Sequence, residues 1–211
     1  MFDRICRVLF LLASVSAGSV SASVFDEAAL WLDAQDAGPV GAEVKVWRDH
    51  RGLPLEAKSS MDVVPRVVET ATGKKAVSFG KFGTRSDMDF PRMNLKAAFL
   101  VMELDRVEHD ANFLLGDEKT WDFQCGDCNG MLARLTTGPS PYFRYAVNGR
   151  KVTTPSTTRI PEGVNLISWH YEKGSFASRF TRDRDLDKAG LTRFGGKRVS
   201  EALFFTRSVS E

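Results

Sequence analysis

The sequence lacks the short motifs that mark the common enzyme and metal-binding classes. It contains only three histidines, His50, His109 and His170, and their spacing does not match that of metal ligands. It has no Gly-x-Ser-x-Gly elbow, no P-loop and no Rossmann glycine run. We therefore expect no cofactor, and no motif indicates a serine hydrolase, a nucleotide-binding enzyme or a dehydrogenase.

An excess of charge of one sign is also missing. The 29 Lys and Arg residues nearly balance the 27 Asp and Glu residues, for a formal net charge of +2. Proteins dedicated to nucleic acids or to membrane surfaces carry a net basic face, so we expect neither as a partner. A length of 211 residues, without an internal repeat, linker or low-complexity segment, indicates one globular domain.

No apolar run is long enough to span a bilayer, but a shorter run lies near the start of the chain. Arg4 and Arg7 precede an apolar run over residues 8–13, and the small residues Val20-Ser21-Ala22 come after it. This order is typical of a secretory signal peptide. We predict a signal peptide over residues 1–22, with cleavage after Ala22. The mature protein is then exported, periplasmic or extracellular, and has no membrane span.

The predicted mature chain, residues 23–211, has few cysteines. Only Cys125 and Cys128 remain, in the motif C-G-D-C. Cys6 precedes the apolar run, so the run is not followed by a lipoprotein box. In an oxidising compartment the pair is predicted to form a small disulfide that closes a loop. Redox chemistry and a metal half-site are the alternatives, although two further ligands for a metal are missing.

Long stretches of helical periodicity are absent, and short alternating segments take their place. The clearest signal is the run over residues 142–152, in which alternating residues lead into Asn148-Gly149. These two residues favour the positive φ angles of a type I′ hairpin turn. Short strands separated by turn residues predict an all-β fold, an antiparallel two-sheet sandwich. The other expected strands cover residues 30–32, 44–47, 61–69 (an edge or irregular segment, because of Pro65), 76–80, 97–104 (central), 113–116, 121–123, 131–135, 164–171 and 199–206.

Several of these segments occur in the order that is found in one family. The set resembles bacterial laminin-G-like domains, which share the concanavalin A-like jelly roll. The resemblance is carried by the segments 29–36, 46–49, 75–79, 98–102, 113–116, 145–149, 166–168 and 202–205. Together they cover nearly the whole mature chain, and their order and spacing are more specific than any single motif.

The resemblance implies two antiparallel sheets packed face to face, with the first and last strands as neighbours. It also implies a module for binding or display, usually without catalysis. We therefore expect an exported, non-catalytic module that binds a carbohydrate or an extracellular surface protein. A structural surface domain without a small ligand is an alternative. Domains of this family continue into a short helix, whereas this sequence stops at Glu211, so we expect the first domain of a longer protein.

One strand also carries the pattern of a glycoside hydrolase. Glu103, Asp105 and Glu108 fit E-x-D-x-x-E, which is similar to the active-site strand of retaining β-glucanases. That similarity implies Glu103 as nucleophile, Asp105 as the residue that tunes it and Glu108 as acid/base, with the two catalytic carboxyl groups roughly 5 Å apart. The two-residue period of a strand places Glu108 on the opposite face unless a bulge intervenes. We prefer the competing interpretation, a strand that runs into a charged surface loop.

Two groups of aspartates and several aromatic residues are weaker candidates for a site. Asp183, Asp185 and Asp187 alternate as at the start of a calcium loop, but the glycine and glutamate that complete such a loop are missing. We prefer a solvated turn, with Ca²⁺ as the alternative. A second group that could hold a hard cation is Asp117, Asp122 and Asp127. The aromatic residues that could stack on a sugar are Trp47, Trp121, Trp169 and Tyr171, with packing in the core as the default.

Overall fold

The computed structural model describes residues 23–104, 115–117, 143–151, 161–180 and 195–209, and the regular elements in them are all β-strands. The strands pair antiparallel throughout, which confirms the predicted all-β class. No described segment forms a helix that is long and apolar enough to cross a membrane. The strands are β1 (Leu30–Asp33), β2 (Val46–Arg48), β3 (Glu56–Lys58), β4 (Arg66–Glu69), β5 (Lys75–Ser78), β6 (Met88–Leu104), β7 (Leu115–Gly116), β8 (Phe143–Val147), β9 (Arg150–Lys151), β10 (Asn165–Phe180) and β11 (Lys197–Phe205).

The strands form one open sheet in the order β4-β5-β11-β6-β10-β8-β9. The first strand, β1, pairs with the last, β11, and β7 pairs with β10. The strand expected to be central, at residues 97–104, is part of β6 and lies between β11 and β10. The segment expected to be irregular or at an edge, residues 61–69, ends in β4 at one end of this order. Both expectations are confirmed.

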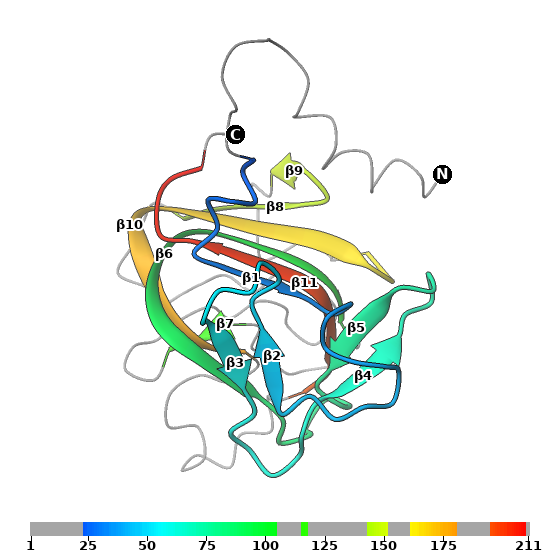
Figure 1. Ribbon diagram of the computed structural model, residues 1–211. Coiled ribbons are helices and arrows are strands. Elements are labelled where there is room, and N and C mark those ends of the chain that lie inside the picture. Colours follow the sequence, from blue (N-terminus) through cyan, green and yellow to red (C-terminus); the bar gives the residue numbers. More distant parts are fainter. Residues whose placement is uncertain (1–22, 105–114, 118–142, 152–160, 181–194, 210–211) are drawn as a thin grey trace.

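Two long, curved strands give the sheet its shape. β6 and β10 have 17 and 16 residues and stay paired as they bend, so that their far halves lie beside β2 and β3 (Figure 1). The register shifts twice, and the first shift lies between His170 and Ser175. Gly174, with φ 84°, lies within it, and a side chain there would clash with Asn94. Bulges of this kind bend a strand and increase its twist.

The hydrophobic core lies inside this bend. Phe180, at the end of β10, lies at its centre, with ring centroids 5.3 Å from Phe90, 5.6 Å from Phe204, 6.0 Å from Phe79 and 6.2 Å from Trp47. All five rings are buried. They come from strands in both halves of the bent sheet and from the end of β5, so their burial holds the two halves together.

The hairpin predicted at residues 142–152 is confirmed. β8 pairs with β9 through Val147 and Arg150, and the two turn residues between them, Asn148 and Gly149, have φ angles of 51° and 76°. The Asn148 side chain also accepts a hydrogen bond from the Leu166 N–H at 2.9 Å. The turn is therefore tied to β10, the strand on which the hairpin packs.

The structure has strands where the sequence indicated none. β3 was not expected, and β6 and β10 extend well beyond the predicted segments 97–104 and 164–171. Pro91 lies inside β6, where a proline normally ends a strand. It is tolerated because the β6–β10 register shifts at this point: Met93 faces Ala177, and Asp89 faces Arg179. Pro91 thus falls in a bulge, one of the positions in a sheet where proline is found.

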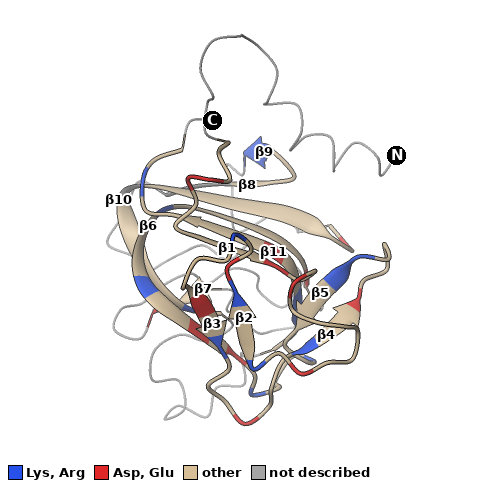
Figure 2. Cartoon of the chain, in the orientation of Figure 1, with Lys and Arg blue, Asp and Glu red and all other residues tan. Residues whose placement is uncertain are grey.

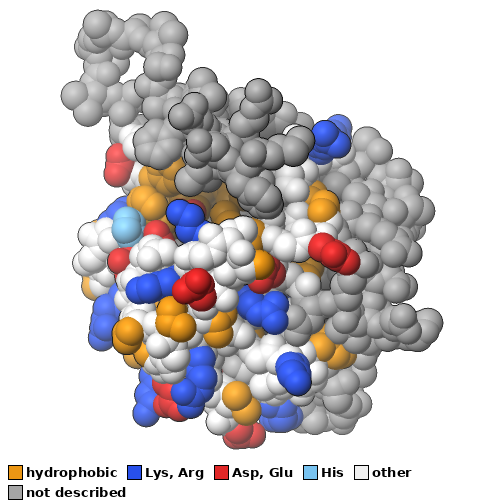
Figure 3. All heavy atoms as spheres, turned by 90° about the vertical axis from the view of Figure 1, so that its right-hand side faces the viewer, with side chains coloured by type: hydrophobic (Ala, Val, Ile, Leu, Met, Phe, Trp, Pro, Cys, Tyr) orange, Lys and Arg blue, Asp and Glu red, His pale blue; other side chains and the backbone are white. Residues whose placement is uncertain are grey.

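Charged residues are spread over the shorter strands rather than gathered in one patch. Figure 2 shows them on β2, β3, β4 and β5. Side chains of both signs alternate over the face that contains β4 and β5, with small apolar areas between them (Figure 3). The described residues of this face create no field of one sign, in keeping with the balanced composition.

Candidate functional site

The hydrolase pattern is only partly within the described residues. Glu103 lies near the end of β6, is 8% exposed and contacts Arg198 on β11, with 3.7 Å between the carboxylate and the guanidinium. Asp105 and Glu108 lie outside the described residues. In this structure Glu103 forms a cross-strand ion pair, and its pairing with a second catalytic carboxyl group stays a prediction.

The aromatic residues proposed to stack on a sugar lie in the core. Trp169 is 1% exposed and Tyr171 is 4% exposed, and Trp47 is also buried. All three belong to the hydrophobic core cluster. Their burial favours the default interpretation, packing in the core, and the assignment of Trp169 and Tyr171 to a ligand site stays a prediction. Trp121 lies outside the described residues.

The proposed cation-binding groups are not assembled in the described part of the chain. Asp117 is fully buried and pairs with Arg92 through two contacts, of 2.8 and 3.0 Å. Its carboxylate is thus neutralised by a guanidinium. No three His, Cys, Asp or Glu residues among those described are placed to hold a metal ion. The other proposed ligands and the cysteine pair lie outside the described residues: Asp122, Asp127, Asp183, Asp185, Asp187, Cys125 and Cys128.

A different group of polar and aromatic residues comes together at Trp31. The alternation of β1 buries Leu30 and Leu32 in the main core and turns Trp31 and Asp33 to the opposite face of the sheet. There Trp31 is half-buried and packs against a second apolar cluster, formed by Ala28, Ala97, Leu203 and Phe205. On the neighbouring strand Asp33 lies opposite Glu201. We call the group formed by Trp31, Asp33, Asp36, His50 and Glu201 the Trp31 site.

A bulge in β11 brings Glu201 to this face. Val199 pairs with Met102, whereas Glu201 pairs with Val101, so Ser200 is an extra residue in β11. Val199 and Ala202 both lie in the core. Without the bulge, the two-residue period would turn Glu201 inward with Val199. The extra residue reverses the phase and directs Glu201 toward Trp31.

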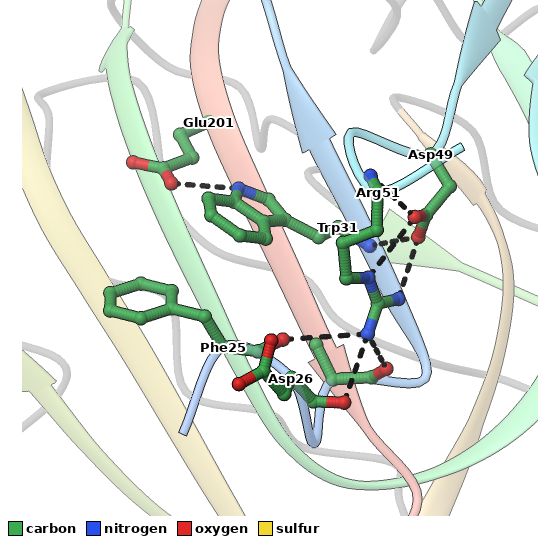
Figure 4. Close-up of polar contacts among 7 residues, drawn as sticks. Phe25, Asp26, Trp31, Asp49, Arg51 and Glu201 are labelled. Atoms are coloured by element: carbon green, nitrogen blue, oxygen red, sulfur yellow. Dashed lines mark hydrogen bonds and ion pairs between the residues drawn. The ribbon is translucent and has the colours of Figure 1, made fainter. Parts of the chain in front are cut away.

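A buried ion pair holds the loop after β2 against β1 (Figure 4). The Asp49 carboxylate accepts hydrogen bonds from Arg51 at 2.7 and 3.1 Å and from the Trp31 N–H at 2.9 Å. Burial alone would raise the pKa of Asp49. The hydrogen bonds from Arg51 and from the backbone N–H groups of Trp31 and Arg51 outweigh burial, so this pKa lies below its ordinary value. Asp49 therefore stays ionised and ties the loop to the strand that carries Trp31.

The same arginine fixes the turn that precedes β1. The Nη1 atom of Arg51 donates to the backbone carbonyls of Ala28 at 2.7 Å, Asp26 at 3.2 Å and Phe25 at 3.4 Å (Figure 4). The turn places the Phe25 ring 5.1 Å from the Trp31 ring, in a stacked arrangement. One guanidinium thus positions two neighbours of Trp31, the loop on one side and the turn on the other.

His50 completes the surroundings of the indole. Its backbone N–H donates to the Trp31 carbonyl at 2.7 Å, and its ring centroid lies 4.2 Å from that of Trp31. The Nδ1 atom of His50 is 2.6 Å from a carboxylate oxygen of Asp36. Both partners of this contact are exposed, so an imidazole and a carboxylate stand at the surface beside the indole.

The surroundings of Glu201 shift the pKa of its carboxyl group. The indole Nε1–H of Trp31 donates to its carboxylate at 2.8 Å (Figure 4). Burial raises the pKa of Glu201, and the negative charge of Asp33 raises it further, against the opposing effects of the Trp31 hydrogen bond and of His50. The site thus combines an aromatic ring, one carboxyl group with a raised pKa, and a His–Asp pair that can donate and accept hydrogen bonds.

None of these five residues was selected as a site residue from the sequence. The alternation in Leu30-Trp31-Leu32 did contain a signal, because two leucines in the core require the tryptophan between them to face outward. No family model, curated protein or solved structure matches the chain. The functional argument therefore depends on the geometry of these residues.

Proposed function

We propose that the protein is an exported, non-catalytic binding module with a jelly-roll architecture, and that it binds a carbohydrate at the Trp31 site. The single observation that carries this proposal is the half-buried Trp31 with its Nε1–H directed to Glu201. Antiparallel pairing of the first and last strands, β1 and β11, supports the architecture. The signal-peptide pattern of residues 1–22 supports export.

The chemistry of the site suits a ligand that has both apolar and hydroxyl surfaces. Binding sites typically combine aromatic surface with a few placed polar groups, which fix the orientation of the ligand. Trp31 and Phe25 supply the aromatic surface, and Glu201 and the His50–Asp36 pair supply acceptors and a donor. Hydrogen bonds to ionised groups are stronger than those between neutral groups. A sugar ring, with C–H groups on its faces and hydroxyls around its edge, matches both features.

A second candidate function, glycoside hydrolysis, is favoured by one specific observation. Asp33 and Glu201 lie directly opposite on β1 and β11, where side chains on one face are roughly 5 Å apart at Cβ. Retaining glycosidases use two carboxyl groups about 5 Å apart, one of them with a raised pKa, and side chains that lie opposite on one face of a sheet can reach that separation. The raised pKa of Glu201 fits the acid role. The Oδ1 atom of Asp33, the candidate nucleophile, accepts a hydrogen bond from the Gln35 N–H at 2.8 Å. One of its two carboxylate oxygens is therefore already engaged.

A binding assay with matched variants tests the proposal. The mature chain is screened on a glycan array, and affinities are measured for Trp31→Ala and for the control Val40→Ala, which removes an exposed apolar side chain elsewhere. We expect Trp31→Ala to weaken binding at least tenfold and the control to leave it unchanged. A blank array, or equal affinities for both variants, would contradict carbohydrate binding at Trp31.

Release of reducing sugar from the bound glycans separates the two functions. The binding module should release none. Turnover that is abolished in both Glu201→Gln and Asp33→Asn would establish the hydrolase instead. Turnover abolished by Glu103→Gln, with Glu201→Gln still active, would point to the E-x-D-x-x-E strand.

A further inference from the structure

A hollow lies away from the Trp31 site, on the far halves of the two long strands, β6 and β10. It has a volume of about 110 Å³ and is lined by Asp89, Phe90 and Arg92 of β6 and by Ser178 and Arg179 of β10. A cavity of about 150 Å³ holds a benzene molecule, so this hollow accepts part of a six-membered ring. None of its residues belongs to the Trp31 site.

The walls of the hollow carry two ion pairs. Arg92 binds the buried Asp117 through two hydrogen bonds, and the Ser178 hydroxyl donates to the same carboxylate at 3.3 Å. Arg179 approaches Asp89 with 3.3 Å between Nε and Oδ1. Each guanidinium is thus matched by one carboxylate. An added anion would find little net positive charge, whereas a neutral ligand would find donors and acceptors.

One acceptor in the wall has no donor among the described residues. The Oδ1 atom of Asp89 is buried and accepts no hydrogen bond in good geometry, although Arg179 is close enough for an ion pair. A buried acceptor without a hydrogen bond is costly, and such a group in a native protein calls for an explanation. A hydroxyl group inside the hollow would supply the missing donor.

An exposed aromatic ring lies beside the hollow. Phe176 is 39% exposed, and the Arg92 guanidinium carbon lies 3.7 Å from the centre of its ring. Phe176 precedes Ser178 by two residues on β10, and it contacts the hollow through Arg92, which lines it. The hollow therefore has polar walls and apolar surface at its margin.

We infer that this hollow is a second ligand site, which takes one unit of a neutral, hydroxyl-rich ligand such as an oligosaccharide. The unfilled acceptor on Asp89, the paired charges and the exposed Phe176 all favour hydroxyl groups next to C–H surface over an anion. The inference does not depend on the Trp31 site, because the two sites share no residue.

Titration of the ¹⁵N-labelled mature chain, followed by NMR, tests this site. The probes are laminarihexaose, cellohexaose and chitohexaose, with sodium sulfate as the anion probe. We expect at least one oligosaccharide to shift the amide signals of Asp89, Phe176 and Ser178 in a saturable way. The indole Nε1–H signal of Trp31 reports on the other site in the same spectra.

Variants assign the effect to the hollow. Phe176→Ala and Asp89→Asn should each weaken this binding at least tenfold, whereas Trp31→Ala and the exposed control Val63→Ala should leave it unchanged. Phe176 is exposed, so its variant should fold even if Asp89→Asn does not. Three results would overturn the inference: no saturable shift with any oligosaccharide, shifts produced only by sulfate, or affinity unchanged in Phe176→Ala. Shifts confined to the Trp31 indole would support the first site and reject the second.

Discussion

Glu201 shows how one residue links the fold to the chemistry of the Trp31 site. Its position opposite Asp33 results from the bulge at Ser200, and its contact with Trp31 results from the alternation of β1. Burial and the charge of Asp33 both raise its pKa. Because the protonated carboxyl group is favoured in the fold, Glu201 binds more protons in the folded state than in the unfolded state.

This difference predicts how Glu201 contributes to stability as the pH changes. A raised folded-state pKa gives a contribution that is fully present below the unfolded-state pKa, near 4.3, and is lost as the pH rises through the folded-state value. Glu201→Gln keeps an oxygen that can accept from Trp31 but cannot ionise. We therefore expect the stability of the wild type relative to Glu201→Gln to decrease as the pH rises from 4 toward 7.

Urea unfolding at several pH values measures this difference. The control is Glu56→Gln on β3, whose carboxyl group is exposed and has a lowered pKa because of Lys58. The stability of the wild type relative to Glu56→Gln should change only slightly with pH, and in the opposite direction. A wild-type minus Glu201→Gln difference that does not change with pH would contradict the raised pKa of Glu201.

At the scale of elements, the loop after β2 and the turn before β1 act as one support for the site. They share the Asp49–Arg51 ion pair, in which the Asp49 carboxylate is fully buried. The same guanidinium bonds three carbonyls of the turn. Loss of this support would release both neighbours of Trp31, namely Phe25 and His50.

A double-mutant cycle on Asp49 and Arg51 tests the support. Removing one partner of a buried ion pair leaves an uncompensated charge and typically costs about 3–5 kcal/mol, so we expect Arg51→Ala to destabilise strongly. The double variant Asp49→Ala with Arg51→Ala should lose less stability than the two single variants together. We expect this difference to be about 1–3 kcal/mol. The free energy of unfolding is measured in urea for the wild type, the two single variants and the double variant. Additive effects would show that the two residues act independently.

At the scale of the whole molecule, the bend of β6 and β10 is the main feature. It brings β2 and β3 over the core, so that one continuous sheet encloses its own apolar side chains (Figure 1). Phe180 contacts rings on both sides of the bend: Trp47 and Phe90 in one half, and Phe204 on β11 in the other. We therefore expect the two halves to unfold together.

Two phenylalanines on the same strand test this dependence. Phe180→Ala should destabilise the protein by about 3–5 kcal/mol, since it opens a cavity among four aromatic rings. Phe176→Ala removes an exposed ring four residues earlier and should change stability by about 0.5 kcal/mol or less. Urea unfolding followed by tryptophan fluorescence and by far-UV circular dichroism measures both. Equal losses for the two variants would contradict a core centred on Phe180.

The sequence alone determined the features that depend on neighbouring residues. Asn148-Gly149 set the hairpin, because both residues tolerate positive φ and the strands around them alternate. Short alternating segments indicated an all-β chain, and the apolar run at residues 97–104 indicated a central strand. In each case the chemistry of a few consecutive residues was sufficient.

Tertiary structure decided which residues form the candidate site. Trp31, Trp47 and Trp169 are the same residue type in similar strands, yet of these three only Trp31 packs on the opposite face of the sheet, against the second apolar cluster, because the phase of β1 against β11 turns it away from the main core. The bulge at Ser200 directs Glu201 to the same face, and the Asp49–Arg51 pair brings His50 to the indole. These positions depend on strand register and on contacts between residues up to 170 apart, as for Trp31 and Glu201. Local sequence patterns carry no information about register across such separations, so only the folded chain could bring this site together.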